Sequence, residues 1–134
     1  MKYLLDTSVC LQPIKRRPVL AALERWDTQG LDALATSAAC LAEIEWGLYK
    51  LASERRWLGY RRDILPSVRA LSVDSNVWSK WAVLKARQDA LGLPVDDIDL
   101  VIAATALCND LIVATLNVRH FAQIEGLCWE DWSC

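Results

Sequence analysis

The 134-residue sequence contains a single histidine, and its five cysteines include no Cys-x-x-Cys pair. Zinc sites are built from closely spaced cysteines and histidines, so a zinc site is excluded. An odd number of dispersed cysteines also argues against a disulfide framework. Cys10, Cys40 and Cys108 lie in apolar runs, and we expect them to be small buried hydrophobic residues, which suits a reducing cytosol.

The sequence also lacks a long apolar run at its start. The segment "MKYLLDTSV" reaches an acid at Asp6 after a short apolar stretch, which fits neither a signal peptide nor a membrane span. No internal repeat, linker or low-complexity segment divides the chain, and its length is that of one ordinary domain. We therefore expect residues 1–134 to form a single domain of a cytoplasmic protein without membrane association.

The sequence also has no excess of positive charge. The formal net charge is −2 and the pI is near 5.3, which excludes nucleic-acid binding through overall charge alone. Any polyanion must therefore be bound locally, by clustered basic residues. Each cluster, taken singly, is most simply a solvated surface. The clusters are Lys15-Arg16-Arg17, Arg55-Arg56, Arg61-Arg62 and the pair Arg119 and His120.

What the sequence does contain is a hydrophobic fraction of 54% with seven tryptophans, enough for a substantial core. Short apolar runs alternate with helical segments along the chain. This alternation predicts an α/β fold with a central, mostly parallel sheet flanked by helices. Strands are expected at residues 2–5, 34–37, 70–73 and 111–115, and helices at residues 18–26, 38–52, 54–65, 75–91 and 97–108.

Polar side chains directly follow two of the expected strands. Asp6, Thr7 and Ser8 come after the first strand, and Thr115 and Asn117 end the last one. Open parallel sheets bind ligands outside the carboxyl ends of their strands, so these residues mark a candidate site. Asp6 alone is equally well explained as a cap of the following turn.

Three aspartates precede the apolar segment "LVIAATALC". Asp96 is explained as a helix cap and Asp97 as a favourable charge near the helix dipole. Asp99 heads a stripe of apolar and small residues, where a carboxylate must be hydrogen-bonded, paired or bound to a cation. Asp97 heads a similar stripe, so helical periodicity alone does not choose between the two.

Two further acids, Glu43 and Glu45, lie in a largely apolar helix, and one of them is expected to face solvent. Gly47 lies one turn beyond Glu43. A glycine inside a helix costs about 1 kcal/mol relative to alanine, so we expect another part of the molecule to approach that face closely. This favours Glu43 as the inward acid.

Convergence of Asp6, Glu43 and Asp99 would require a counterion. Two carboxylates about 4 Å apart repel by about 4 kcal/mol at an effective dielectric constant of about 20. Oxygen ligands without a cysteine or histidine cluster select Mg²⁺ or Mn²⁺. Such a centre can activate water and clamp a phosphodiester, as in one- and two-metal nucleases.

Three motifs occur in the order "LLDTSV", "LAEIEWGL" and "DLVIAATALCNDLIVATLNVRHF". Together they resemble the PIN-domain ribonucleases, particularly the VapC-type toxins of toxin–antitoxin pairs, over nearly the whole chain. The resemblance implies that Asp6, Glu43 and Asp99 are the metal-binding, catalytic acids. It also implies that Ser8 supports Asp6 or a bound water.

The closing motif of this family is matched less well. Thr115 and Asn117 occupy it as supporting residues, followed by His120, whereas many members carry a fourth acid there. The metal site would therefore hold only three carboxylates. His120 is either a general acid or RNA contact or a structural histidine, and Arg119 is the better candidate for a phosphate contact, because a guanidinium suits bidentate recognition.

The activity that the resemblance implies is Mg²⁺- or Mn²⁺-dependent endonucleolytic cleavage of RNA, leaving a 5′-phosphate and a 3′-hydroxyl. The implied partners are a second copy of the chain, giving a homodimer, and an antitoxin that covers the site. Residues 46–60 are the candidate contacts, although Trp46 and Trp57 are equally well explained as core.

Other functions fit the sequence less well. A haloacid-dehalogenase-type enzyme needs a second acid two residues after the first, where this chain has Ser8. A receiver-type phosphoacceptor domain lacks its acidic pair and its late lysine. The remaining alternative is a PIN-like module that binds RNA or protein without cutting it. Three acids on three separate elements argue against that alternative, because a binding module has no need of mutually repelling carboxylates.

Overall fold

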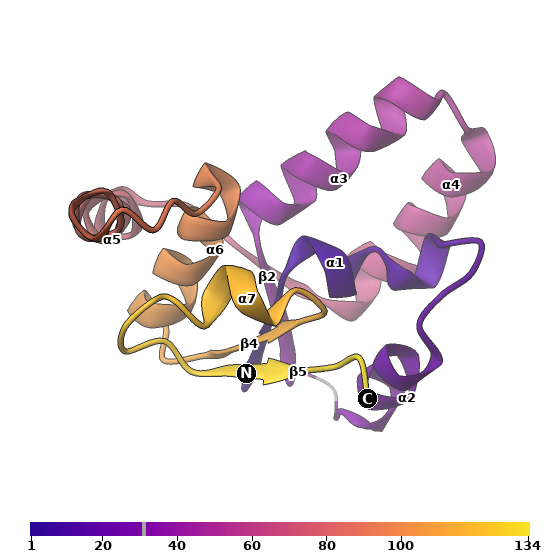
Figure 1. Ribbon diagram of the computed structural model, residues 1–134. Coiled ribbons are helices and arrows are strands. Elements are labelled where there is room, and N and C mark those ends of the chain that lie inside the picture. Colours follow the sequence, from indigo (N-terminus) through magenta and orange to yellow (C-terminus); the bar gives the residue numbers. More distant parts are fainter. Residues whose placement is uncertain (31) are drawn as a thin grey trace.

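The computed structural model describes residues 1–30 and 32–134, which fold around a single sheet (Figure 1). Within these residues five parallel strands lie in the order β3-β2-β1-β4-β5. They are β1 (Tyr3–Leu5), β2 (Leu34–Ser37), β3 (Arg69–Leu71), β4 (Ile112–Thr115) and β5 (Trp129–Asp131). The predicted α/β fold is confirmed, and the sheet is wholly parallel.

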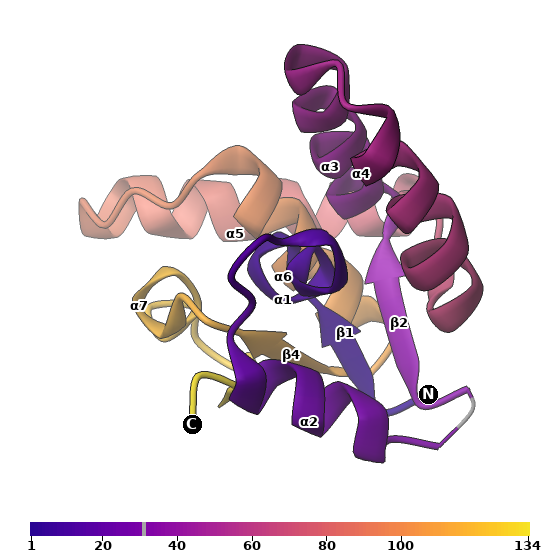
Figure 2. The same cartoon turned by 90° about the vertical axis from the view of Figure 1, so that its right-hand side faces the viewer.

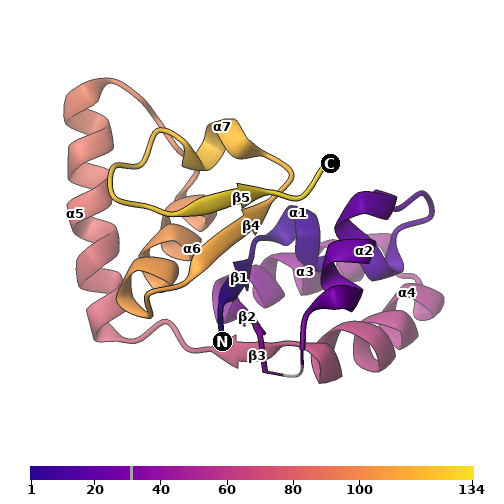
Figure 3. The same ribbon diagram turned by 90° about the horizontal axis from the view of Figure 1, so that it is seen from below.

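The helices lie on both sides of this sheet. The longer ones are α2 (Leu20–Thr28), α3 (Ala38–Leu51), α4 (Glu54–Gly59), α5 (Ser75–Leu91) and α6 (Asp97–Cys108). Short helical turns are α1 (Thr7–Cys10), the 3-10 turn η1 (Gln12–Ile14) and α7 (Val118–Phe121). Helix α2 covers one face of the sheet, and α5 and α6 lie on the other (Figures 2 and 3). Within the described ranges no helix is both long and apolar enough to cross a membrane.

The central strands are buried on both faces, which explains their uninterrupted apolar sequence. Leu4 of β1 is aligned with Val113 of β4 and is completely buried, as is its partner. Helix α6 is buried without a break from Leu100 to Ala106. Its run of alanines allows the helix to lie close against the sheet, where it contacts β2 and β4. The absence of a polar face on α6 is therefore a consequence of burial on all sides.

The topology brings several chain segments to the carboxyl edge of the sheet. Strand β1 ends at Leu5, directly before Asp6, and β4 ends at Thr115. Helix α3 begins directly after β2, and Ser37 caps it by accepting a hydrogen bond from the Ala39 N–H at 3.1 Å. Because a short turn joins α6 to β4, the first turn of α6, with Asp97, also lies at this edge. Residues far apart in the sequence thus meet there.

The structure differs from expectation between residues 54 and 67. One continuous helix over residues 54–65 was expected. Instead α4 ends at Gly59, a π-helical turn (η2) spans Tyr60–Ile64, and a 3-10 turn (η3) spans Leu65–Ser67. Pro66 explains the tighter last turn, because its ring cannot occupy the interior of an α-helix.

Two other features were missed or mistaken. Strand β5 was not expected, since an edge strand of three residues carries no alternating pattern. Cys108 was expected to be buried, but it lies at the exposed end of α6, whereas Cys10 and Cys40 are buried as predicted.

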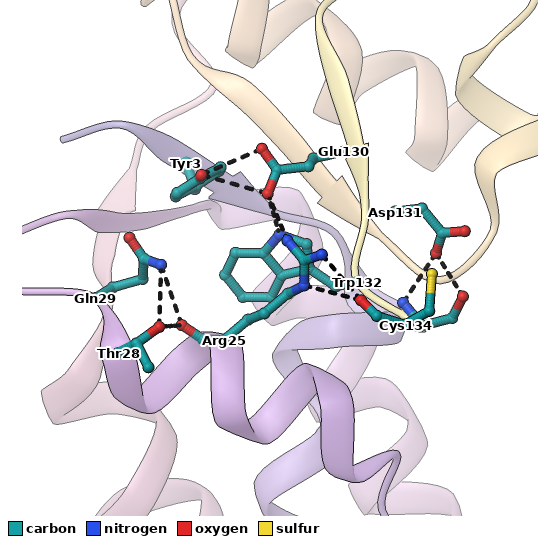
Figure 4. Close-up of polar contacts among 9 residues, drawn as sticks. Tyr3, Arg25, Thr28, Gln29, Glu130, Asp131, Trp132 and Cys134 are labelled. Carbon is teal, nitrogen blue, oxygen red and sulfur yellow. Dashed lines mark hydrogen bonds and ion pairs between the residues drawn. The ribbon is translucent and has the colours of Figure 1, made fainter.

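The carboxyl-terminal segment is bonded to α2 through Arg25 and to β1 through Tyr3 (Figure 4). The Arg25 guanidinium donates to the Glu130 carboxylate at 2.8 Å and to the Cys134 carbonyl oxygen at 2.9 and 3.1 Å. Glu130 also accepts hydrogen bonds from the Tyr3 hydroxyl and the Trp132 indole. These bonds explain how a short edge strand keeps its place beside β4.

Alanine substitutions at two helical glycines, Gly59 and Gly47, should have opposite effects on stability. A methyl group added at Gly59 would lie 2.9 Å from the Ile14 Cγ2 atom, whereas one added at Gly47 meets nothing within 4 Å. Gly59→Ala should therefore lower the free energy of unfolding by about 1–2 kcal/mol through overpacking. Gly47→Ala should raise it by about 0.5–1 kcal/mol through helix propensity. Urea unfolding measures both, and equal effects of the two substitutions would contradict the close contact at Gly59.

Candidate functional site

A pocket of about 480 Å³ opens at the carboxyl edge of the sheet. Its walls come from the end of β1, from α3, from the start of α6 and from the segment after β4. The polar side chains that matter most in it are Asp6, Glu43, Asp96, Asp99, Asn117 and His120. The structure therefore brings the three acids singled out in the sequence, Asp6, Glu43 and Asp99, to one pocket. Their roles as ligands or catalysts stay predictions.

Asp6 is the most firmly held of these acids. Its Oδ1 atom accepts hydrogen bonds from the Ser8 hydroxyl at 2.6 Å and from the Val9 N–H at 3.0 Å. Its Oδ2 atom accepts one from the Thr115 hydroxyl at 2.6 Å. The bond from Val9 caps α1, so the capping interpretation is correct, and Asp6 lines the pocket as well.

Burial disfavours the charge of Asp6, which is 2% exposed. Desolvation raises its pKa from the ordinary value of 3.8 to about 6, although the hydrogen bonds from Ser8, Thr115 and Val9 oppose the rise. The negative charge of Asp99 raises it slightly further. A bound cation in the pocket would oppose both causes of the rise and stabilise the carboxylate.

Asp99 is paired with His120. The Nδ1 atom of His120 lies 2.8 Å from the Asp99 Oδ2 atom, and the Asp99 side chain is mostly buried. Desolvation raises the pKa of Asp99, the contact with His120 opposes the rise, and the charges of Asp96 and Glu43 add to it. The sequence reasoning left the role of His120 open and did not foresee this pairing.

The prediction that Glu43 is the inward acid is consistent with its place in the pocket, but two supporting arguments were wrong. Glu45 was to be the solvent-facing acid, yet its carboxylate accepts a hydrogen bond from the Tyr60 hydroxyl at 2.6 Å. Among the described residues nothing packs closely on Gly47, which instead lines an open groove. Glu43 itself is half-buried at the border between this groove and the acidic pocket.

The aspartates at the start of α6 also differ from expectation. Asp96 occupies the cap position, but its side chain accepts no capping hydrogen bond and lines the pocket instead. Asp97 points away from the pocket, is exposed and pairs with Lys85 of α5 at 3.2 Å. The choice of Asp99 over Asp97 as the pocket acid, which periodicity left open, agrees with these positions.

The remaining predicted site residues lie at or near the pocket. The Ser8 hydroxyl joins Asp6 to the Leu116 N–H, and the Thr115 hydroxyl accepts from the Asn117 N–H at 2.8 Å. Asn117 is exposed on the pocket wall. Arg119 does not line this pocket. It borders a neighbouring hollow of about 300 Å³ with Asp96 and His120.

The donor set of the pocket suits a hard divalent cation. Four carboxylates line it, together with the Asn117 amide and the His120 imidazole. Oxygen ligands of this kind prefer Mg²⁺ or Mn²⁺. As the side chains lie, no three acidic, histidine or cysteine groups of the described residues are close enough to chelate one ion. Water ligands, which Mg²⁺ commonly retains, would complete such a site.

Two functional neighbours escaped the sequence reasoning. Lys15 lines the pocket together with the acids, and so does Gln12, whose side chain is buried. The run Lys15-Arg16-Arg17 was visible in the sequence but was assigned to a solvated surface. Only the fold shows that this surface adjoins the acidic pocket.

Comparison with known proteins identifies the family. Residues 3–127 match the family model of the PIN domain. The chain belongs to the PIN-domain family. It is 31% identical over 134 residues to the tRNA(fMet)-specific endonuclease VapC of Shigella flexneri, an alignment that covers 99% of each chain. It is 30% identical to Ribonuclease VapC2 of Haemophilus influenzae, with 98% of each covered. The resemblance to VapC-type PIN domains is thereby confirmed.

Solved structures agree with this assignment. A chain in the DNA-bound VapBC structure from Salmonella typhimurium has a TM-score of 0.88 and 31% identity, and 98% of each chain is covered. A chain of FitAcB from Neisseria gonorrhoeae gives a TM-score of 0.84 at 26% identity, with 97% of each covered. This PIN domain therefore shares its whole fold with chains from both structures.

The aromatic residues outside the pocket are only partly core. Trp46 was equally well explained as core, but it is 62% exposed and stacks under the Lys50 ammonium group. Trp57 is half-buried, with edge-on contacts to the rings of Tyr49 and Tyr60. This PIN domain thus exposes aromatic surface on α3, beside the groove that contains Gly47.

The raised pKa of Asp6 predicts a pH-dependent stability in protein stripped of metal. A folded-state pKa of about 6 against 3.8 means that folding takes up a proton between these values. Stability should therefore rise as pH falls from 7.5 to 5, because the cost of the charged Asp6 is fully present only above pH 6. Asp6→Asn should stabilise the stripped protein at pH 7.5 by about 2 kcal/mol and weaken the pH dependence.

Urea unfolding with a chelator at pH 7.5 and pH 5 measures this effect. The control is Asp97→Asn, which removes an exposed acid from the same region. An Asp6→Asn variant that retains the full pH dependence of the wild type would show that Asp6 is not the group that takes up the proton.

Proposed function

We propose that this chain is a metal-dependent endoribonuclease and the toxin of a toxin–antitoxin pair. The observation that carries the proposal is the meeting of Asp6, Glu43 and Asp99 from three separate elements in one pocket. Membership of the PIN-domain family and the names of the VapC relatives support it. The name of the Shigella relative specifies tRNA(fMet), so a structured RNA of that class is the first substrate to test.

In this proposal Asp6, Glu43 and Asp99 hold Mg²⁺ or Mn²⁺. When bound, the ion supplies an activated water and neutralises charge on the phosphodiester. The protein itself orients the carboxylates that would hold the ion. Ser8 and Thr115 fix both carboxylate oxygens of Asp6, and His120 fixes Asp99 through Nδ1.

Two pocket residues are assigned to the RNA. To the Nε2 atom of His120, which has no partner among the described residues, we assign donation of a proton to the leaving 3′ oxygen. To the Asn117 amide, which is exposed on the pocket wall, we assign a hydrogen bond to a base or phosphate. Arg119, in the adjoining hollow, is a further phosphate contact.

The alternative of a module that only binds RNA or protein is less well supported. Keeping Asp6 charged in a buried position is costly, as its raised pKa indicates. The charges of Asp96 and Glu43 likewise raise the pKa of Asp99. A binding surface gains nothing from that cost, whereas a metal centre requires these charges.

Cleavage of tRNA(fMet) by the purified protein should require Mg²⁺ or Mn²⁺ and stop with a chelator. Asp99→Asn should lower the cleavage rate by about 100-fold or more, because it removes a charge from the metal site. The control Asp97→Asn, two residues away but turned to Lys85, should stay within about twofold of the wild type. The measurement is the initial rate of product formation on a denaturing gel.

Equal losses in both variants would show that the acidic helix end acts as a whole and that Asp99 has no special role. Metal-independent RNA binding without cleavage, in the wild type and in both variants, would favour the binding-only alternative.

The groove beside the pocket is the proposed docking site for the antitoxin. It has a volume of about 280 Å³ and is lined mainly by apolar side chains of η1 and α3, among them Leu11, Ile14 and Trp46. Glu43 and Lys15 belong to both the groove and the acidic pocket. A segment bound along the groove would therefore reach the acids and could block them, consistent with the VapBC complexes among the structural neighbours.

A substitution that fills this groove should leave the protein toxic but prevent its neutralisation by the antitoxin. A Cβ atom added at Gly47 meets nothing within 4 Å among the described residues, and the groove beside it is open, so the Gly47→Leu variant should retain the fold. The antitoxin, taken as the small protein encoded beside this gene, should then fail to relieve growth arrest. Gly47→Ala is the control and should remain neutralised. Full rescue of the Gly47→Leu variant by the antitoxin would place the antitoxin elsewhere.

The homodimer implied by the family resemblance stays a prediction. Exposed apolar side chains on α5, including Trp78 at 50% and Val83 at 51% exposure, provide surface for it. Light scattering coupled to size-exclusion chromatography measures the mass directly.

A further inference from the structure

A second hollow, of about 380 Å³, is lined by four cationic side chains: Lys15, Arg16, Arg17 and Arg56. Lys15 lines the acidic pocket too, so the two hollows adjoin. Among the described residues, none of the four cations forms an ion pair with a carboxylate. In a chain with a net charge of −2, this concentration of unneutralised positive charge is local and lies beside the proposed catalytic acids.

The loop that carries three of these cations is held rigidly. The buried side chain of Gln12 donates to the Ser8 carbonyl oxygen at 2.8 Å and accepts from the Val19 N–H at 2.7 Å. Its amide therefore bridges the two ends of the loop. Pro13 and Pro18 flank the cations and restrict the backbone further. A loop ordered in this way loses little conformational entropy when it binds a ligand.

The fourth cation comes from a different element. Arg56 lies on α4, whose start is capped by the Ser53 hydroxyl, which accepts from the Arg56 N–H. Helix α4 approaches η1 so closely that a methyl group at Gly59 would lie 2.9 Å from Ile14. This close contact brings Arg56 beside the loop. The packing of α4 against η1 thus holds the four mutually repelling cations close together.

We propose that Lys15, Arg16, Arg17 and Arg56 bind phosphate groups of the RNA strand next to the bond that is cut. The proposal rests on the nuclease function proposed above and extends it to the path of the substrate. An RNA strand places phosphates at regular short intervals, so a strand held at the acids continues into the adjoining hollow along Lys15. Guanidinium groups bind phosphate oxygens in pairs, and such contacts position the strand without reading its sequence.

The test compares two double variants that each remove two positive charges. Arg16→Gln with Arg17→Gln removes them from the hollow. Lys80→Gln with Arg87→Gln removes them from α5, where both residues are exposed and line none of the hollows described above. Binding of a labelled single-stranded RNA of mixed sequence is measured by fluorescence anisotropy at several salt concentrations, in an Asp6→Asn background.

The slope of log affinity against log salt should become shallower by about 1.4 in the Arg16/Arg17 variant, since each lost contact with single-stranded RNA contributes about 0.7. The control pair should change it little. In the Asp6-containing protein, KM for tRNA(fMet) should rise about tenfold while kcat changes less than about twofold, because the contact acts in the ground state and the transition state alike.

The outcomes separate this proposal from the nuclease proposal. If the wild type cuts no RNA but the Arg16/Arg17 variant loses salt-dependent binding, the nuclease function fails and the phosphate site stands. If the wild type cuts RNA and both double variants keep its KM and salt slope, the phosphate site is wrong. Loss of binding to polyglutamate, with RNA binding unchanged, would assign the hollow to an acidic protein segment and overturn the proposal.

Discussion

The hydrogen bonding of the buried Asp6 carboxylate is the interaction on which the rest of the site depends. Three hydrogen bonds, from Ser8, Val9 and Thr115, tie it to α1 and to the end of β4. They join the two central strands at the edge where the other acids arrive. Because these bonds do not fully offset desolvation, the pKa of Asp6 stays raised to about 6. The fold thus holds a carboxylate in place at a cost that a bound cation would remove.

The surface around Asp6 consists of three adjoining regions that differ in charge and polarity. The acidic pocket is bordered by the cationic hollow on the side of Lys15 and by the apolar groove on the side of Gly47. Lys15 belongs to all three regions, and Glu43 to two of them. A substrate phosphate chain and an apolar protein segment would therefore approach the same acids over neighbouring surfaces. Competition between them follows from this arrangement without any conformational change.

Some of the site was accessible from sequence because the signal was local. Asp6 follows a short apolar run, and its position at a strand end could be inferred from that run alone. Asp99 could not be identified as the site acid in this way, because Asp97 has an equivalent pattern of helical neighbours. The family motif distinguished the two. The argument from Gly47 reached a useful residue, Glu43, for a wrong reason. The glycine marks open space rather than close packing.

What the sequence by itself determined was the order and type of the main elements, because strand and helix periodicities are properties of neighbouring residues. What only the tertiary structure decided was which side chains meet. The hydrogen bonds of His120 with Asp99 and of Tyr60 with Glu45 join residues 21 and 15 positions apart. Lys15 lines the same pocket as Asp99, which lies 84 positions away in the sequence. Such contacts depend on how the helices pack on the sheet, and no local pattern encodes that geometry.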